Sequence, residues 1–129
     1  MNRIQTIIQK FDFNPCTLSF GEAREYLYFL QDELRPFKRK AETNKVSEEI
    51  LNRLKIVEIF YDALAHNDNV SWLDFDKLYY SLQNSPENLD INELTVLNYY
   101  LAKKIAEGVH ESDLEKTLLQ VRSMLKAYH

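Results

Sequence analysis

Three histidines and a single cysteine are the side chains of this chain best suited to metal binding or nucleophilic catalysis. His110 lies at helical spacing from Glu107 and Glu111, but a metal-binding helix of the His-Glu-x-x-His kind needs a second histidine, which is missing. Cys16 lies in a predicted loop without the positive or glycine-rich setting that activates a thiol. We therefore predict no catalytic residue, no metal site, no cofactor and no enzymatic activity.

Two stretches of the sequence have the outline of a known binding motif but lack the residues that the motif requires. The stretch 66–78 carries several aspartates between two predicted helices, as calcium-binding EF-hand loops do. However, Ser71 stands where that loop needs glycine, and Lys77 stands where it needs a bidentate glutamate. The stretch 105–115 has the outline of a helix-turn-helix, but acids such as Glu115 open its second helix and would repel phosphate. We expect neither calcium binding nor sequence-specific recognition of DNA.

A basic segment between residues 35 and 45 is the chain's one positive cluster, and it includes an aromatic residue, Phe37, that could stack on a base. The cations also complement the dipole at the end of a helix, which explains them more simply. The alternative functional hypothesis nevertheless rests on this segment: the chain would be a nucleic-acid-associated regulator that contacts phosphates through it. The candidate polyanion-binding residues are Arg35, Lys38, Arg39, Lys40 and Lys45.

A second apolar face on one predicted helix is the observation on which the first functional hypothesis depends. Val96, Tyr99 and Tyr100 point away from the leucine stripe of that helix. The preceding stretch, 66–93, carries six acids and one lysine around several aromatic side chains. Tyrosine is enriched at protein interfaces. Burial of the helix on both faces is the favoured explanation, and a partner protein is the other one.

The first hypothesis is a non-enzymatic protein–protein interaction module, meaning a small cytoplasmic adaptor, inhibitor or immunity-type factor. It would bind another, basic protein through an acidic–aromatic helical surface. The candidate partner-binding residues are Trp72, Asp74, Asp76, Tyr80, Glu93, Val96, Tyr99 and Tyr100.

Composition limits the classes of protein that the chain can belong to. Its 129 residues, 45% hydrophobic and 28% charged, predict one globular domain over residues 1–129. A lone cysteine fits a reducing compartment, and the first residues lack a secretory signal, so we predict a cytoplasmic protein. The charge-free stretch 94–102 is too short to cross a bilayer. The net charge of −4 arises in the second half of the chain, which does not favour duplex binding there.

Hydrophobic periodicity predicts an all-α bundle of five to six helices. The first helix should end before Pro15, and the second should begin at the capping-box pair Ser19 and Glu22. A stripe from Phe20 to Phe37 then marks its buried face, with a kink or an end expected near Arg35 because Pro36 follows.

Four more helices complete the expected bundle. The third should begin at a Ser47 cap and be the buried central helix, because its second half is apolar nearly all round. Ser71 and Asp90 should cap the fourth and fifth helices, and Gly108 should end the fifth. The sixth should open at Ser112 and carry a narrow apolar stripe of Leu114, Leu118, Val121, Leu125 and Tyr128. Such a stripe would suit a homodimer through this last helix.

Overall fold

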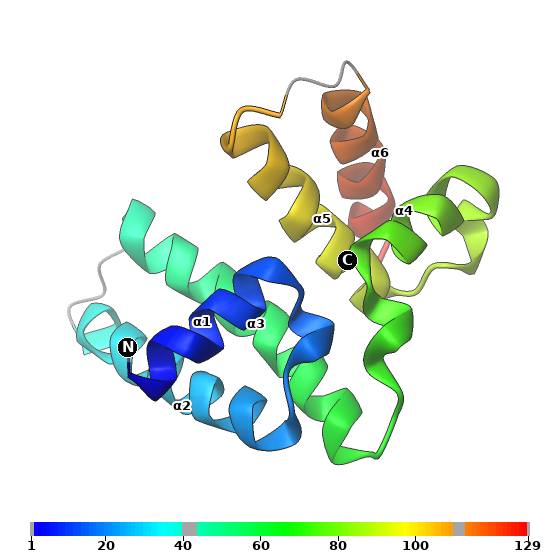
Figure 1. Ribbon diagram of the computed structural model, residues 1–129. Helices are drawn as coiled ribbons and strands as arrows, with labels where there is room; N and C mark the ends of the chain where they lie inside the picture. Colours follow the sequence, from blue (N-terminus) through cyan, green and yellow to red (C-terminus); the bar gives the residue numbers. More distant parts are fainter. Residues whose placement is uncertain (1, 40–43, 110–112, 129) are drawn as a thin grey trace. The chain divides into compact units, whose positions relative to one another are not determined.

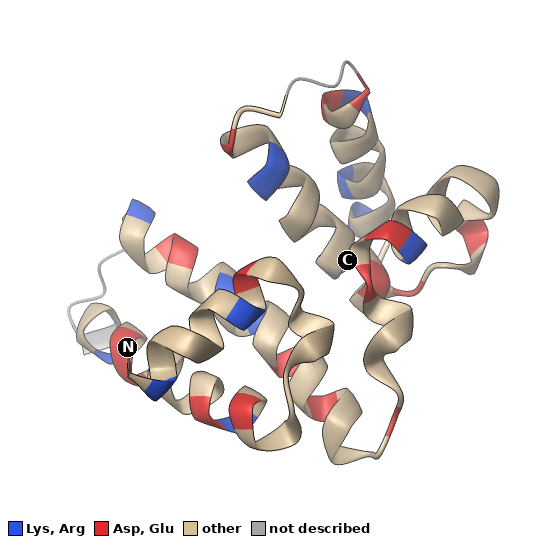
Figure 2. Cartoon of the chain, viewed as in Figure 1, with Lys and Arg blue, Asp and Glu red and all other residues tan. Residues whose placement is uncertain are grey.

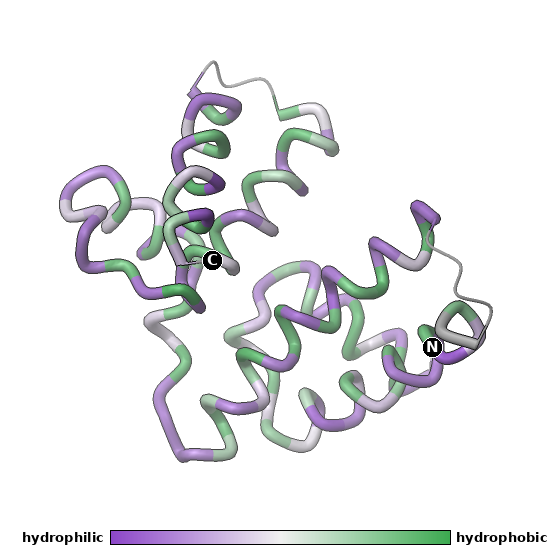
Figure 3. The backbone as a smooth tube through the Cα atoms, turned by 180° about the vertical axis from the view of Figure 1, so that it is seen from behind, coloured by the Kyte–Doolittle hydropathy of each residue, from purple (hydrophilic) through white to green (hydrophobic). Residues whose placement is uncertain are grey.

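The computed structural model describes residues 2–39, 44–109 and 113–128, and every regular element in those ranges is helical. Those residues form six α-helices, and 84% of them are helical when the 3-10 turns are included. Hydrophobic and hydrophilic residues alternate along each helix, as Figure 3 shows, so each helix has an apolar face to bury. The predicted all-α bundle is confirmed.

The helices fall into two compact units, Met1–Ser71 and Trp72–His129, and Figure 1 labels their helices. Unit 1 contains α1 (Arg3–Phe13), α2 (Phe20–Arg39) and α3 (Lys45–Ala65), and unit 2 contains α4 (Phe75–Asn84), α5 (Ile91–Ala106) and α6 (Leu114–Lys126). Short 3-10 turns occupy Pro15–Thr17, Val70–Leu73 and Pro86–Asn88. In unit 1, α2 packs against α3. In unit 2, α5 packs against both α4 and α6. The single domain over residues 1–129 stays a prediction.

The first two helices begin and end where local sequence signals place them. In α1, the side chain of Asn2 accepts a hydrogen bond from the Gln5 amide, and the Gln5 side chain accepts one from the Asn2 amide. This helix ends at Phe13, before the first proline, as predicted. At the start of α2, the Glu22 amide donates to Ser19 Oγ at 3.2 Å and the Ser19 amide donates to Glu22 Oε1 at 3.0 Å. The predicted capping box is confirmed.

Helix α2 continues through Pro36 to Arg39, so it does not end near Arg35, and the alternative, a kink there, stays a prediction. A proline removes one backbone hydrogen bond and crowds the preceding turn. Pro36 stands close to the end of the helix, where few bonds remain to be lost. The buried stripe lies before it, down to Leu34 at 5% exposure, and holds most of the helix in place.

Helix α3 begins earlier than the sequence suggested. Its cap is Asn44, whose side chain accepts a hydrogen bond from the Ser47 amide, while Ser47 Oγ accepts one from the Asn44 amide at 2.9 Å. The prediction of Ser47 as the cap is therefore wrong, because this residue is the second partner of the capping box. The helix ends before Asn67, which adopts the left-handed backbone conformation (φ 59°). Asparagine tolerates this conformation better than most residues with a side chain.

The core of unit 1 is built on the second half of α3. Its Ile56, Val57 and Phe60 are each at most 1% exposed. From the other two helices, Phe11 and Tyr26 meet edge to face, with ring centroids 5.2 Å apart. The predicted burial of the third helix is confirmed.

The 3-10 turn Val70–Leu73 precedes α4, and the cap of α4 is Asp74, whose side chain accepts a hydrogen bond from the Asp76 amide. The prediction of Ser71 as the cap is wrong, and Trp72 lies before the helix. The inner face of α4 carries Leu78 and Leu82, which are 1% and 2% exposed. The helix is therefore anchored along one side.

Helix α5 has the predicted cap at Asp90, which forms a capping box with Glu93. At its end, Gly108 adopts φ 83°, and the amides of Gly108 and Val109 bond back to the carbonyls of Ile105 and Lys104. This pair of bonds is a Schellman motif, which needs a residue that tolerates positive φ. The predicted stop at Gly108 is confirmed.

The buried stripe of α6 is shorter than predicted. Leu114, Leu118 and Val121 are buried, but Tyr128 lies beyond the helix, is 53% exposed and donates a hydrogen bond from its hydroxyl to the Leu89 carbonyl at 3.3 Å. The predicted cap, Ser112, lies outside the described residues. A homodimer through this helix stays a prediction.

Candidate functional site

Three of the predicted partner-binding residues lie on the surface of unit 2. Tyr80 is 68% exposed on α4, Asp76 is exposed one turn earlier on the same helix, and Trp72 is 38% exposed in the preceding 3-10 turn. We call these residues the α4 surface. Figure 2 shows acidic positions at the start of α4 and in the connection to α5. The surface therefore combines aromatic area with negative charge.

Two other candidates are not on the surface. Val96 is fully buried and Tyr100 is 8% exposed, so neither can form an accessible patch, and their assignment to a partner surface is corrected. The Tyr100 ring meets the Tyr99 ring edge to face at 4.9 Å and the Phe75 ring at 6.2 Å. The favoured expectation, that this helix is buried on both faces, is confirmed. Tyr99 is half-buried.

The remaining two acidic candidates already have structural roles. The carboxylate of Asp74 accepts a hydrogen bond from the Asp76 amide at 3.0 Å and caps α4. The carboxylate of Glu93 accepts from the Asp90 amide at 3.0 Å, and burial raises the pKa of Glu93 while this hydrogen bond opposes the rise. Charge reversal at either position would remove a helix cap, so Asp76 is the better probe of the surface.

The structure describes only part of the basic segment proposed for polyanion binding. Arg35 forms an ion pair with Asp32 at 2.7 Å on the surface of α2, and Lys45 is exposed at the start of α3. Lys38 and Arg39 belong to the end of α2 by their backbone, and Lys40 lies outside the described residues. The nucleic-acid alternative stays a prediction.

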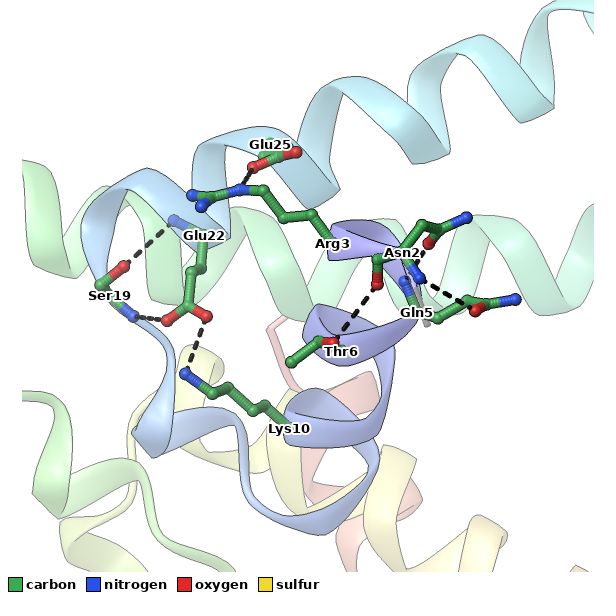
Figure 4. A network of polar contacts seen from close by, with 8 residues as sticks. All are labelled: Asn2, Arg3, Gln5, Thr6, Lys10, Ser19, Glu22 and Glu25. Carbon is green, nitrogen blue, oxygen red and sulfur yellow. Dashed lines mark hydrogen bonds and ion pairs between the residues drawn. The ribbon is translucent and has the colours of Figure 1, made fainter.

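A network of polar contacts joins α1 to the start of α2 (Figure 4). Lys10 Nζ donates to Glu22 Oε2 at 2.8 Å, and Glu22 also takes part in the capping box with Ser19. Arg3 pairs with Glu25 one turn further along α2. The hydrogen bond from Lys10, followed by that from the Ser19 amide, lowers the pKa of Glu22. The network therefore stabilises unit 1 through the ionised form of this carboxylate.

We expect Lys10→Met to lower the free energy of unfolding by about 0.2–1 kcal/mol at neutral pH, since the pair is partly solvated. The folded-state pKa of Glu22 is below its unfolded value, so the contribution is present above the unfolded pKa. It is lost as the pH falls through the folded pKa. Urea denaturation near neutral pH and near pH 3 measures this difference. The exposed Lys55→Met is the control, and a loss in Lys10→Met that persists in acid would contradict the assignment.

A second polar cluster in unit 1 lies closer to its core. Arg53 Nη1 donates to Asp12 Oδ1 at 2.8 Å and to the Tyr26 hydroxyl at 3.1 Å, and its guanidinium lies 5.7 Å from the Phe11 ring centroid. Burial raises the pKa of Tyr26, and Arg53 opposes that rise. These contacts tie α3 to α1 and α2, which gives the cluster a structural role.

The structure also shows an exposed face of unit 1 that the sequence reasoning missed. Phe20, Arg24 and Tyr28 follow one another at four-residue spacing on α2, and Tyr61 of α3 stacks on Phe20 with ring centroids 5.1 Å apart. Phe20 is 41% exposed and Tyr28 is 50% exposed, so the predicted burial of Phe20 in the core stripe is wrong. The regular spacing of an arginine between two aromatic residues could have signalled this face.

Within the described parts of the chain, no group of three or more His, Cys, Asp or Glu side chains is placed to hold a metal ion. The Cys16 thiol is half-buried and donates to the Val70 carbonyl at 3.0 Å, within unit 1. Among the described helices, none is long and apolar enough to cross a membrane. No family model, curated protein or solved structure matches the chain.

Proposed function

We propose that the chain is a non-enzymatic protein–protein interaction module, a small cytoplasmic adaptor, inhibitor or immunity-type factor that binds a basic partner protein through the α4 surface. The observation that carries the proposal is Tyr80, a tyrosine with 68% of its surface exposed on a helix that is anchored along its opposite side. A large aromatic side chain on a rigid helix offers contact area at low entropic cost.

The charge around Tyr80 favours a basic partner. Residues 72–93 contain five acids and one lysine, and Asp76 is exposed one turn before Tyr80. Negative charge beside an aromatic anchor attracts cationic groups and discourages acidic ones. Cytoplasmic placement is supported by the lone cysteine, which forms no intramolecular disulfide.

The test is affinity capture with the full chain as bait, followed by titration of the captured basic protein against variants. We expect Tyr80→Ala to weaken binding by about tenfold or more, because truncating a central interface tyrosine commonly costs at least ~1.4 kcal/mol. Asp76→Lys should also weaken it, mainly through slower association.

Glu115→Lys is the matched control for Asp76→Lys. Both acids are exposed at the second position of a helix, so both changes alter the net charge and the helix dipole equally. Binding that survives Asp76→Lys and Tyr80→Ala, or that falls equally with Glu115→Lys, would rule out the α4 surface. Circular dichroism of each variant confirms that the helices are retained.

A further inference from the structure

The exposed face of unit 1 formed by Phe20, Arg24, Tyr28 and Tyr61, here called the arginine–aromatic face, has the residue types that dominate protein interfaces. The guanidinium carbon of Arg24 lies 5.6 Å from the centroid of the Tyr28 ring. The neighbouring Tyr28 and Tyr61 side chains raise the pKa of Arg24. The arginine is therefore held in place by aromatic side chains.

Arg24 differs from its neighbours in how its charge is balanced. Among the arginine side chains that the structure describes in unit 1, the other three each face a carboxylate: Arg3 pairs with Glu25, Arg35 with Asp32 and Arg53 with Asp12. No described carboxylate forms an ion pair with Arg24, although the residue is exposed. The face thus presents, between exposed aromatic rings, a cation that has no carboxylate partner among the residues that the structure describes.

The contact with the ring leaves the hydrogen-bond donors of the Arg24 guanidinium available to a ligand. A guanidinium that lies over an aromatic ring uses its planar face, while its five N–H donors lie in its own plane. Those donors match the two oxygens of a carboxylate. Phe20 and Tyr28, on either side along the helix, offer apolar area for the side chains that flank such a carboxylate.

We propose that the arginine–aromatic face binds an acidic segment of a partner protein, with a carboxylate on Arg24 and apolar or aromatic side chains against Phe20 and Tyr28. This face consists of residues of unit 1, whereas the α4 surface consists of residues of unit 2, and the two have opposite charge preferences. Each proposal can be tested without the other, because the two surfaces consist of different residues.

The experiment titrates the full chain against a short fluorescein-labelled peptide of repeated Glu-Gly-Phe and follows fluorescence anisotropy. We expect binding that weakens about tenfold or more in Arg24→Gln, because hydrogen bonds between two charged groups are stronger than those between neutral groups. Tyr28→Ala should weaken binding as well. A peptide with Gln in place of Glu should bind the unchanged protein as weakly as the acidic peptide binds Arg24→Gln.

Arg35→Gln is the matched control, since it removes the same charge from the same helix at a residue already paired with Asp32. Binding retained by Arg35→Gln and lost in Arg24→Gln supports the proposal. No binding, an undiminished affinity in Arg24→Gln, or an equal loss in Arg35→Gln overturns it. Tighter, Arg24-dependent binding of an oligothymidylate would assign the face to nucleic acid and overturn the acidic segment as its occupant.

Discussion

Replacing Phe60 by alanine is expected to lower the free energy of unfolding by about 3–5 kcal/mol, the range typical of a large aromatic side chain removed from a packed core. Phe60 is 0% exposed on α3, and its neighbours on that helix, Ile56 and Val57, are equally buried. The substitution removes apolar contact and leaves a cavity that the surrounding helices can close only in part. A loss of this size is a large share of the stability of a small domain.

The matched control is Phe13→Ala. It makes the same chemical change at a residue that is 86% exposed at the end of α1, where we expect an effect within about 0.5 kcal/mol. Urea denaturation followed by circular dichroism gives both values. Equal losses in the two variants would mean that Phe60 does not occupy the core of unit 1.

The features that the sequence predicted well are those decided by a few neighbouring residues. The capping pairs Ser19–Glu22 and Asp90–Glu93 and the stop at Gly108 all depend on groups within one helical turn. Hydrophobic periodicity placed the helices between these signals. Because such interactions are local, their spacing in the sequence is enough to identify them.

The two wrong caps have a common cause. In each case two residues able to cap a helix stand three positions apart, and the structure uses the one that the prediction did not choose: Asn44 rather than Ser47, and Asp74 rather than Ser71. Both residues of a pair can accept a hydrogen bond from a free amide. The choice depends on the position at which the preceding chain enters the helix. That position is set by the packing of the rest of the unit and not by local spacing.

Exposure was harder to predict than helicity, and it decides the candidate surfaces. Periodicity placed Phe20 on the buried stripe of α2, yet its ring stacks on Tyr61, more than forty positions away, and stays 41% exposed. Val96 and Tyr100 were assigned to a partner surface and are buried. Periodicity defines the faces of a helix, but long-range packing decides which of them is covered.

Replacing Leu97 by alanine is the corresponding test in unit 2, with an expected loss of about 2–5 kcal/mol in the free energy of unfolding. Leu97 is 0% exposed on α5, the helix that packs against both α4 and α6. Leu119→Ala on α6 is the matched control, because Leu119 is 65% exposed and its truncation leaves no cavity. Urea denaturation of the two variants measures the difference. Comparable losses would contradict the placement of Leu97 at the centre of unit 2.

The same variant tests the prediction that residues 1–129 form a single domain. In an all-or-none transition, every amide that exchanges only through global unfolding loses the same protection when one core residue is removed. Leu97→Ala should therefore speed hydrogen exchange at the slowest amides of α3 in unit 1 as much as at those of α5. Exchange that quickens within residues 72–129 alone would contradict one cooperative domain, because each unit would then unfold with a free energy of its own.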